Sequence, residues 1–306
     1  MNGYIGSVRF FKNLILLLVI VFITVPTVFS FRYKAQVTDL KAQLAQQQAQ
    51  QAADNEKLNQ QIQALEEELK TFHVDPEWPD YQSLYPDFYA PQQLSATTRE
   101  ENVIYLTFDD GPSYRTPEVL EILREENVKA TFFVIGKDSE TRREWMRAIV
   151  DDGHTIAMHS YTHEYATIYA SVEDYLHDMY QIFTMIREAT GVTPTHFRMP
   201  GGSVNGYNYE VSQEIITEML RRGFIPYDWN ISSGDASTDG ATPDEILYNV
   251  LRGAGGNRGI VLMHDSIAKY STVDALRSII QTLREMGYTF DGLQADTAPI
   301  LFSYTY

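Results

Sequence analysis

From residue 103 onward, short apolar segments alternate with longer amphipathic segments, and this alternation restricts the fold more than any other feature of the sequence. The strands that it predicts are Val103–Phe108, Thr131–Val134, Thr155–Met158, His196–Met199, Phe224–Trp229, Gly259–Met263 and Tyr288–Phe290. Helical patterns lie between them, near residues 117–126, 140–152, 171–190, 208–222, 243–254 and 272–286. Such alternation predicts an α/β domain with a parallel sheet, either open or closed into a barrel of about seven repeats.

Polar residues directly follow the first predicted strand. The segment TFDDGPS places two adjacent carboxylates, Asp109 and Asp110, at the carboxyl end of that strand, where α/β sheets carry their functional side chains. Asp, Gly and Pro are also common turn residues, so this segment alone is equally well explained as a turn. Two neighbouring carboxylates that point to different sides could instead divide the roles of metal ligand and base.

The third predicted strand is followed by HSYTH, which places His159 and His163 four residues apart. On one helical turn, two histidines at this spacing can present both imidazoles to one metal ion. The spacing alone is weak evidence. With an aspartate from another strand end, such a pair supplies three protein ligands and leaves positions for water and substrate. Because the chain has no cysteine, any metal must be held by nitrogen and oxygen ligands.

Further polar residues end the later strands. Arg198 begins the segment RMPGG and could direct a cation and backbone amides toward the same site, although a structural salt bridge is the alternative. Asp228 and Trp229 end the fifth strand, and His264 lies in the segment LMHD at the end of the sixth. A buried aspartate beside a histidine raises the pKa of the histidine, which suits it to act as an acid. Taken singly, Trp229 and His264 are better explained as core residues.

All five segments occur in a fixed order, each at its own strand end, and together they resemble the NodB-homology polysaccharide deacetylases of carbohydrate esterase family 4. The resemblance spans about residues 101–291 and is specific as a set, although each segment alone is not. It implies a distorted (β/α) barrel with fewer than eight repeats, a divalent metal that is usually zinc, and hydrolysis of N-acetyl or sometimes O-acetyl groups on a polysaccharide substrate.

The resemblance also implies a role for each matching residue. The metal ligands would be Asp110, His159 and His163. Asp109 would be the base that takes a proton from water on the metal, and Arg198 would orient that base. His264 would protonate the leaving amine, with Asp228 holding the histidine. These roles together describe an amide hydrolysis that uses one base and one acid.

Trp229 and Gly201 are assigned to substrate binding by the same resemblance. Trp229 would form a wall of the sugar pocket. Gly201 stands where many relatives carry an aromatic residue or another side chain. The oxyanion donor expected at this position is a backbone N–H, which glycine retains. The departure therefore affects substrate contacts more than catalysis.

Residues 1–36 are predicted to form an N-terminal membrane anchor with basic flanks. Leu14–Phe31 is an uncharged apolar stretch of 18 residues, and a membrane helix takes ~20. A secreted protein cleaved near Ser30 is the alternative, although the apolar core of a cleaved signal is usually only about 7–15 residues. We expect a single-pass protein of the cell membrane with its catalytic domain outside. Basic residues on both sides of the stretch leave its orientation weakly specified.

Three segments follow the anchor. Residues 37–72 are rich in Gln, Ala, Glu and Leu. This composition predicts a helical stalk with a weak coiled-coil seam, through which the chain could associate weakly with itself. A solvated single helix is the alternative. The seam positions are Val37, Leu44, Leu58, Leu65 and Phe72, interrupted by Gln51. Residues 73–100 carry prolines among aromatic residues and predict a linker that packs on the catalytic domain, which we place at residues 101–306.

The charge of the chain narrows the choice of partner. With 24 basic and 41 acidic side chains the formal net charge is -17, which excludes the basic surface that nucleic-acid binding requires. We expect an exported hydrolase that acts on N-acetylglucosamine units of peptidoglycan or a related polymer. The alternatives are an esterase of acetylxylan or another O-acetylated glycan, and a catalytically silent glycan-binding scaffold. The intact candidates for acid, base and ligands favour an enzyme.

Overall fold

The chain forms two compact units, Met1–Trp78 and Pro79–Tyr306. The structure, a computed structural model, describes residues 10–18, 22, single positions and short runs between 34 and 61, and residues 79–91, 102–137, 139–237, 240–256 and 258–303. The functional residues expected from the sequence all lie in the second unit.

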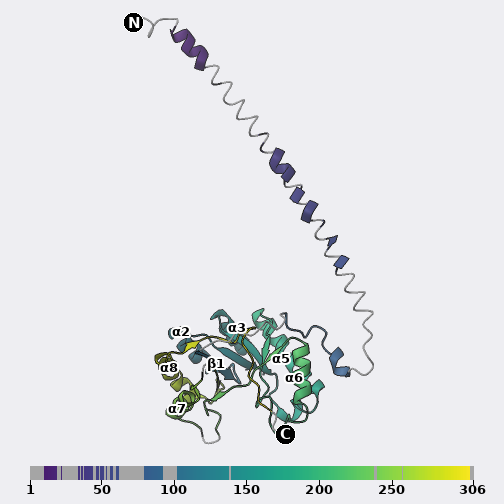
Figure 1. The fold of residues 1–306 in the computed structure, drawn as a ribbon, viewed down its shortest axis with the longest axis vertical. Coiled ribbons are helices and arrows are strands. Elements are labelled where there is room, and N and C mark those ends of the chain that lie inside the picture. Colours follow the sequence, from purple (N-terminus) through teal and green to yellow (C-terminus); the bar gives the residue numbers. More distant parts are fainter. Residues whose placement is uncertain are drawn as a thin grey trace. The chain divides into compact units, whose positions relative to one another are not determined.

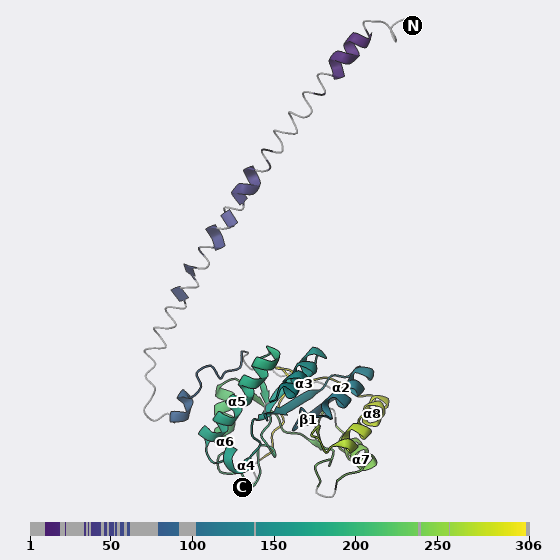
Figure 2. The ribbon, with the colours of Figure 1, turned by 180° about the vertical axis from the view of Figure 1, so that it is seen from behind.

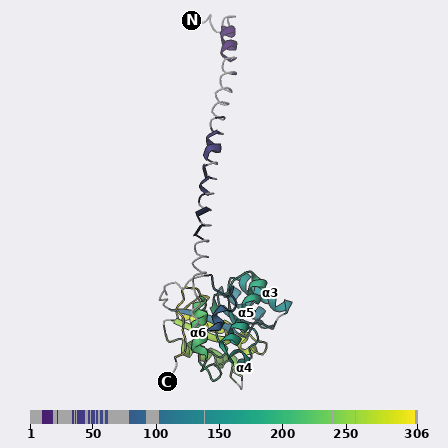
Figure 3. The ribbon, with the colours of Figure 1, turned by 90° about the vertical axis from the view of Figure 1, so that its right-hand side faces the viewer.

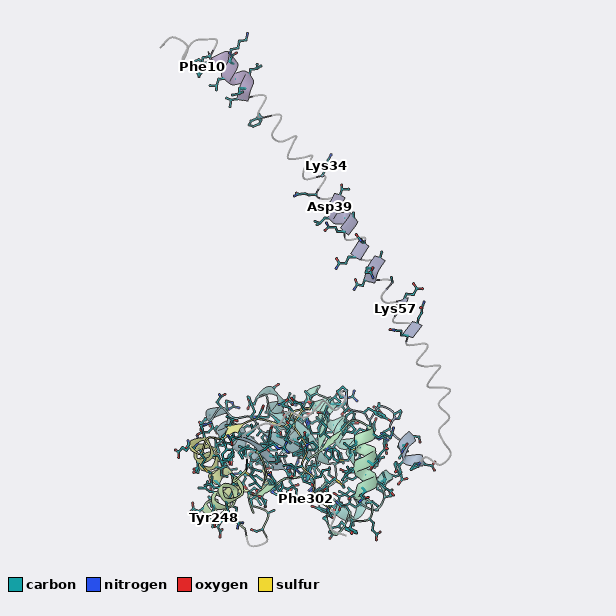
Figure 4. All side chains as sticks on the ribbon, viewed as in Figure 1. Phe10, Lys34, Asp39, Lys57, Tyr248 and Phe302 are labelled. Carbon is teal, nitrogen blue, oxygen red and sulfur yellow. The ribbon has the colours of Figure 1, made fainter. Side chains whose placement is uncertain are left out.

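In the first unit the described residues are helical, and side chains such as Lys34, Asp39 and Lys57 stand out from the helix (Figure 4). Within these described residues, none of the helices combines the length and the apolar character needed to cross a membrane. Most of the apolar stretch Leu14–Phe31 lies outside the described residues, as do the seam positions of the stalk between residues 37 and 72. The membrane anchor and the coiled-coil seam therefore stay predictions.

The second unit is built on a parallel sheet in the order β5-β4-β3-β2-β1-β7-β6, with β8 paired to β1. The strands are β1 Val103–Asp109, β2 Thr131–Ile135, β3 Thr155–Ser160, β4 His196–Phe197, β5 Ile225–Pro226, β6 Ile231–Ser232, β7 Arg258–His264 and β8 Thr289–Phe290. Among the described residues no pairing joins β5 to β6. The sheet is therefore an incomplete barrel, in agreement with the predicted α/β fold and its distorted (β/α) barrel.

Helices cover the outer face of this sheet (Figure 1). The helices of this unit are η1 Asp80–Ser83, α2 Thr116–Glu125, α3 Glu140–Asp151, α4 Tyr165–Ile168, α5 Val172–Thr190, α6 Ser212–Arg221, α7 Pro243–Gly253 and α8 Tyr270–Glu285, and the cover is formed by α2, α3, α5, α6, α7 and α8. Figure 2 shows α6, α5, α3, α2, α8 and α7 following one another in an arc, and neighbours in this arc contact each other. Figure 3 shows α3, α5 and α6 from the side. The helices thus repeat the order of the strands that precede them.

Side chains of β1 alternate between the helices and the interior of the barrel. Ile104, Leu106 and Phe108 belong to the main hydrophobic core under the helices. Tyr105 faces the other way, into a smaller buried cluster that also contains Phe133 and Tyr227. Because successive side chains of a strand point to opposite faces, Thr107 and Asp109 continue the inward face of Tyr105. The strand therefore carries Asp109 to the inner rim of the barrel.

Residues 79–91 belong to the second unit and pack on it. Phe88 is fully buried, with ring centroids 5.0 Å from Phe183 and 4.7 Å from Phe224. The buried guanidinium of Arg222 pairs with Glu218 at 2.6 Å. It also donates hydrogen bonds to the backbone carbonyls of Tyr81, Leu84, Tyr85 and Phe88. This segment is thus tied to the end of α6 by both apolar and polar contacts.

The predicted and observed elements differ most between residues 224 and 232. The predicted strand Phe224–Trp229 contains only the short strand Ile225–Pro226, and β6 at Ile231–Ser232 was not predicted. A strand of two residues is too short to show any periodicity in the sequence. This difference has a direct consequence for the functional site, because β6 determines which aspartate reaches His264.

Candidate metal centre and active site

Two neighbouring carboxylates at the end of β1 face different partners. Asp109 is the last residue of β1, and Asp110 has a positive φ of 69°, a left-handed conformation that Asp adopts more readily than most residues. Oδ1 of Asp109 accepts a hydrogen bond of 2.8 Å from Nη1 of Arg198, whereas Oδ1 of Asp110 lies 3.1 Å from Nε2 of His163. The turn of the backbone therefore directs the two carboxylates to different nearest partners, although Oδ2 of Asp109 also lies 3.8 Å from Nε2 of His159.

Asp110, His159 and His163 converge at this point. One potential ligand atom of each lies within 4.8 Å of the others, and Nε2 of His159 is 3.5 Å from Oδ1 of Asp110. That oxygen is buried and has no hydrogen-bond partner among the described residues. Since a buried carboxylate oxygen that accepts no hydrogen bond is costly, a cation between the three groups would explain the arrangement. One carboxylate and two imidazoles form a donor set that suits zinc.

The two histidines do not share a helical turn, and this part of the expectation was wrong. His159 lies in β3, and its Nδ1 donates to the backbone carbonyl of Arg198 at 2.8 Å, so that Nε2 faces Asp110. His163 lies in the loop after β3 with a positive φ of 59°. A backbone acceptor on one ring nitrogen fixes the orientation of a histidine and frees the other nitrogen for a metal.

Asp178 of α5 determines the shape of that loop. Its Oδ2 accepts hydrogen bonds from Ser160 Oγ at 2.6 Å and from the backbone N–H of Tyr161 at 2.7 Å, and its Oδ1 accepts from the N–H of Thr162 at 2.8 Å. Ser160 Oγ in turn accepts from the N–H of His163 at 2.8 Å. The sequence analysis did not single out Asp178. The available signal was a buried acid on the otherwise apolar face of the helix predicted at 171–190.

Arg198 holds Asp109 from inside the barrel. The guanidinium is fully buried, and its Nη1 donates to Asp109 and, at 2.7 Å, to Thr107 Oγ1. Its Nε donates to the carbonyl of Tyr227 at 2.9 Å, and its Cζ lies 4.1 Å from the ring centroid of Phe133. Burial raises the pKa of Asp109, although the charge and hydrogen bond of Arg198 oppose the shift. Arg198 thus orients Asp109 and stabilises its ionised form.

His264 is paired with Asp235, not with Asp228 as the resemblance led us to expect. Nδ1 of His264 lies 2.8 Å from Oδ1 of Asp235, and the N–H of His264 donates to Oδ2 at 2.7 Å. Thr272 of α8 donates to the same Oδ2 at 2.8 Å. Strand β6 pairs with β7, which brings the residues after β6 beside His264. The sequence analysis did not single out Asp235, because β6, the strand that it follows, was not predicted.

The pKa of His264 is raised to about 9. Burial alone would lower it, but the hydrogen bond and charge of Asp235, together with the charges of Asp109 and Asp110, outweigh that effect. His264 is the register partner of Asp109 across β1 and β7. His264 and the carboxylate of Asp109 therefore stand on neighbouring strand ends, next to the candidate metal ligands.

Asp228 has different partners. Its Oδ1 accepts from the N–H of Ser203 at 2.9 Å, and its Oδ2 accepts from the N–H of Phe302 at 2.7 Å and from the hydroxyl of Ser203. Trp229, which follows it, is half-buried, and its ring packs edge-on against Phe302 with centroids 4.8 Å apart. Figure 4 labels Phe302 on the second unit. Asp228 thus joins the segment after β4 to the C-terminal segment and supports Trp229.

Gly201 is exposed and has a φ of 76°, where a side chain would be strained. A Cβ at this position would lie 2.9 Å from the ring of Tyr165 and 3.0 Å from Nδ2 of Asn205. The ring of Tyr165 itself lies 5.3 Å from that of His163. Tyr165 therefore occupies the space next to Gly201, which explains why a larger residue does not fit there.

Comparisons with known proteins agree with this geometry. The family described as polysaccharide deacetylase matches residues 96–219. A peptidoglycan-N-acetylglucosamine deacetylase of Bacillus cereus is 33% identical over 212 residues, which are 68% of this chain and 74% of that protein. The family match includes Asp109, Asp110, His159, His163, Arg198 and Gly201, and it ends before Asp228, Asp235 and His264.

Two solved structures are similar to the chain. The catalytic domain of peptidoglycan N-acetylglucosamine deacetylase from Eubacterium rectale matches with a TM-score of 0.66 at 33% identity, over 69% of this chain and 98% of that one. The polysaccharide deacetylase Bc1974 from Bacillus cereus matches with a TM-score of 0.59 at 32% identity, over 66% and 96%. The similarity covers nearly the whole length of both solved chains.

Proposed function

The chain belongs to the polysaccharide deacetylase family, carbohydrate esterase family 4, and from this membership we propose that it removes acetyl groups from N-acetylglucosamine units of peptidoglycan in a metal-dependent reaction. As a member of this family it is a hydrolase of N-acetyl amide bonds. The observation that carries the proposal is the convergence of Asp110, His159 and His163. Asp109 and His264, which are register partners on β1 and β7, lie at the strand ends next to this cluster.

The proposed metal is held by Asp110, His159 and His163. The fit rests on the unpartnered buried Oδ1 of Asp110 and on the two Nε2 atoms that face it. A divalent cation bound there, zinc in our proposal, would supply Lewis-acid polarisation of the acetyl carbonyl and of water. The chain has no cysteine and therefore no thiolate ligand. Histidine and carboxylate ligands alone are compatible with a catalytic zinc site.

The remaining steps are assigned to residues of the chain. Asp109 accepts a proton from the attacking water, since Arg198 occupies its Oδ1 and leaves Oδ2 for this task. His264 donates a proton to the leaving amine, and Asp235 keeps it protonated and oriented. The backbone N–H of Gly201 is the proposed donor to the developing oxyanion. Trp229 is the proposed wall of the sugar pocket.

The test measures acetate released from purified peptidoglycan, chitin oligosaccharides and acetylxylan, with and without a chelator. We expect release from substrates that carry N-acetylglucosamine, loss of release with the chelator and recovery when a divalent metal is added back. Faster release from acetylxylan would favour an O-acetyl esterase. Metal-loaded protein that binds glycans without releasing acetate would favour the silent scaffold, and activity that resists complete metal removal would contradict the metal.

Localisation is a separate part of the proposal. We propose that the stretch Leu14–Phe31 anchors the chain in the cell membrane and that the catalytic unit lies outside, next to its polymeric substrate. The support is the length of this uncharged stretch, 18 residues. Secretion after cleavage near Ser30 is the alternative, and fractionation of cells that produce the chain distinguishes the two.

A further inference from the structure

Tyr165 lies against two parts of the candidate active site. It is the first residue of the short helix α4, which follows β3, and it is partly exposed. Its ring stands at 89° to that of His163, with the ring centroids 5.3 Å apart. A Cβ at Gly201 would lie 2.9 Å from Cε1 and 3.2 Å from Oη of Tyr165. The phenol is therefore next to both a candidate metal ligand and the residue whose N–H is the proposed oxyanion donor.

The hydroxyl of Tyr165 makes no hydrogen bond within the part of the chain that the structure describes. Other side chains hold the segment that contains Gly201: the hydroxyl of Tyr169 donates to the carbonyl of Pro200 at 2.7 Å, and Nδ2 of Asn205 donates to the same carbonyl at 3.1 Å. A phenol hydroxyl keeps its proton at neutral pH and can donate it to an acceptor. The hydroxyl of Tyr165 is thus a donor that the fold itself does not use.

The position of this hydroxyl suits a donor that shares one acceptor with the backbone N–H of Gly201. Because Cβ and N of one residue are about 2.5 Å apart, Oη of Tyr165 lies no more than about 5.7 Å from the nitrogen of Gly201. Two donors that each approach one oxygen to about 2.9 Å can be as far apart as about 5.8 Å. A single oxygen atom of a substrate can therefore be within reach of both groups.

On the basis of the proposed deacetylase function, we propose that Tyr165 is a further catalytic residue, whose hydroxyl donates a hydrogen bond to the acetyl oxygen of the substrate together with the N–H of Gly201. This oxygen gains negative charge when water attacks the carbonyl carbon and loses it when the C–N bond breaks. A donor that is already in place stabilises this charge with little reorganisation. The proton of Tyr165 stays on its own oxygen, so Asp109 and His264 keep their roles as base and acid.

Gly201 is part of this arrangement, because the space next to it is taken by the phenol. Any side chain at position 201 would begin with a Cβ that collides with the ring of Tyr165. Glycine therefore permits α4 to supply a polar group at a place where residue 201 itself offers only its backbone. The two positions act as a pair, one giving up its side chain and the other filling the space with a hydrogen-bond donor.

The first test is Tyr165→Phe, which removes the hydroxyl and keeps the ring against His163. With N-acetylated chitin oligosaccharides we expect kcat to fall about 10²-fold, as for a lost oxyanion donor. KM should change little, because the uncharged carbonyl of the bound substrate gains less from the donor than the oxyanion does. Tyr248→Phe removes a hydroxyl from an exposed ring on α7 and is the matched control, with kcat and KM unchanged. Equal kcat in the parent and Tyr165→Phe would overturn the proposal.

A second substrate separates a direct hydrogen bond from a purely structural role. Sulfur is a weaker hydrogen-bond acceptor than oxygen, so an N-thioacetyl oligosaccharide gains little from the hydroxyl. We expect Tyr165→Phe to slow the N-thioacetyl substrate by a much smaller factor than the N-acetyl substrate. A ring that only positioned its neighbours would slow both substrates by the same factor, and that result would contradict the proposal.

Metal content separates the hydroxyl from an effect that passes through His163. We expect Tyr165→Phe to retain as much metal as the parent after dialysis. If the variant instead loses metal, and saturating metal restores its full turnover, Tyr165 acts only on the metal ligand and the proposal is wrong.

Binding of acetohydroxamate to the metal-loaded protein, measured by calorimetry, tests the hydrogen bond without turnover. Its carbonyl oxygen resembles the acetyl oxygen of the substrate, and we expect Tyr165→Phe to bind it about ten-fold less tightly than the parent does. If no glycan releases acetate but this difference in affinity is found, the proposed function fails and the role of Tyr165 stands. If the parent and the variant release acetate at equal rates and bind acetohydroxamate equally, the function stands and the role of Tyr165 fails.

Discussion

Asp235 and Asp228 are buried aspartates seven positions apart, and they serve different partners. Asp235 contacts His264 and Thr272, whereas Asp228 accepts hydrogen bonds from Ser203 and the backbone of Phe302. The geometry therefore predicts that they differ in their effect on the acid that protonates the leaving group.

Replacing Asp235 with Asn should move the basic limb of the pH–rate profile. The pKa of His264 is raised to about 9, so its proton is retained below that pH and activity falls as the pH rises through that value. Without the charge of Asp235, the pKa of His264 drops toward its usual value of about 6.5, and activity should fall at lower pH. Asp228→Asn is the matched control. An unchanged basic limb in Asp235→Asn, or a shift only in Asp228→Asn, would contradict the pairing.

At the scale of elements, α5 supports the candidate metal ligands without contributing one. Asp178 binds the segment after β3 through four donors, which belong to Ser160, Tyr161 and Thr162. That segment carries His163, so the position of this ligand depends on a helix that is formed elsewhere in the chain. The loop has no regular structure of its own to hold it.

Asp178→Asn should therefore weaken metal binding although it alters no ligand. We expect metal affinity to fall about ten- to a hundred-fold, as for other residues that orient metal ligands, while excess metal restores most of the activity. Glu173→Gln, an exposed change on the same helix, is the control. The measurement is metal content after dialysis against a series of free-metal concentrations, and equal affinity in both variants would refute the role of Asp178.

The elements that the sequence predicted well are those with long, uninterrupted patterns. Strand β1 and helices α3 and α5 were recognisable because their apolar residues repeat over many positions. The candidate ligands were recognisable because they directly follow such strands. Asp235 and Asp178 were not, because one follows a strand of two residues and the other acts across the fold. Tertiary contacts of this kind leave no local pattern in a sequence.

At the scale of the whole molecule, we expect catalysis to depend on the second compact unit alone. All the candidate site residues lie in Pro79–Tyr306, and residues 79–91 are packed into that unit by Phe88 and by the hydrogen bonds of Arg222. A catalytic unit without these residues would expose apolar surface and leave Nη1 and Nη2 of the buried Arg222 without their backbone acceptors.

A chain that starts at residue 79 should hydrolyse small acetylated oligosaccharides as fast as the full chain, and it should no longer fractionate with membranes. A chain that starts at residue 92 should be unfolded or strongly destabilised, because it lacks Phe88, whose replacement with Ala alone is expected to cost about 3–5 kcal/mol. Thermal unfolding, acetate release and cell fractionation check the three outcomes. Full stability of the shorter chain would show that residues 79–91 are dispensable.

The central claim is that Asp110 binds a metal while its neighbour Asp109 acts as a base, and paired Asn variants test it most directly. Metal per chain and acetate release are measured for the parent, Asp109→Asn and Asp110→Asn, at saturating metal and after dialysis. Asp109→Asn should keep its metal and lose about 10²-fold or more of its turnover, whereas Asp110→Asn should lose both metal and activity, because ligand charge contributes to binding. Equal metal loss in the two variants, or an Asp109→Asn variant as active as the parent, would contradict this assignment.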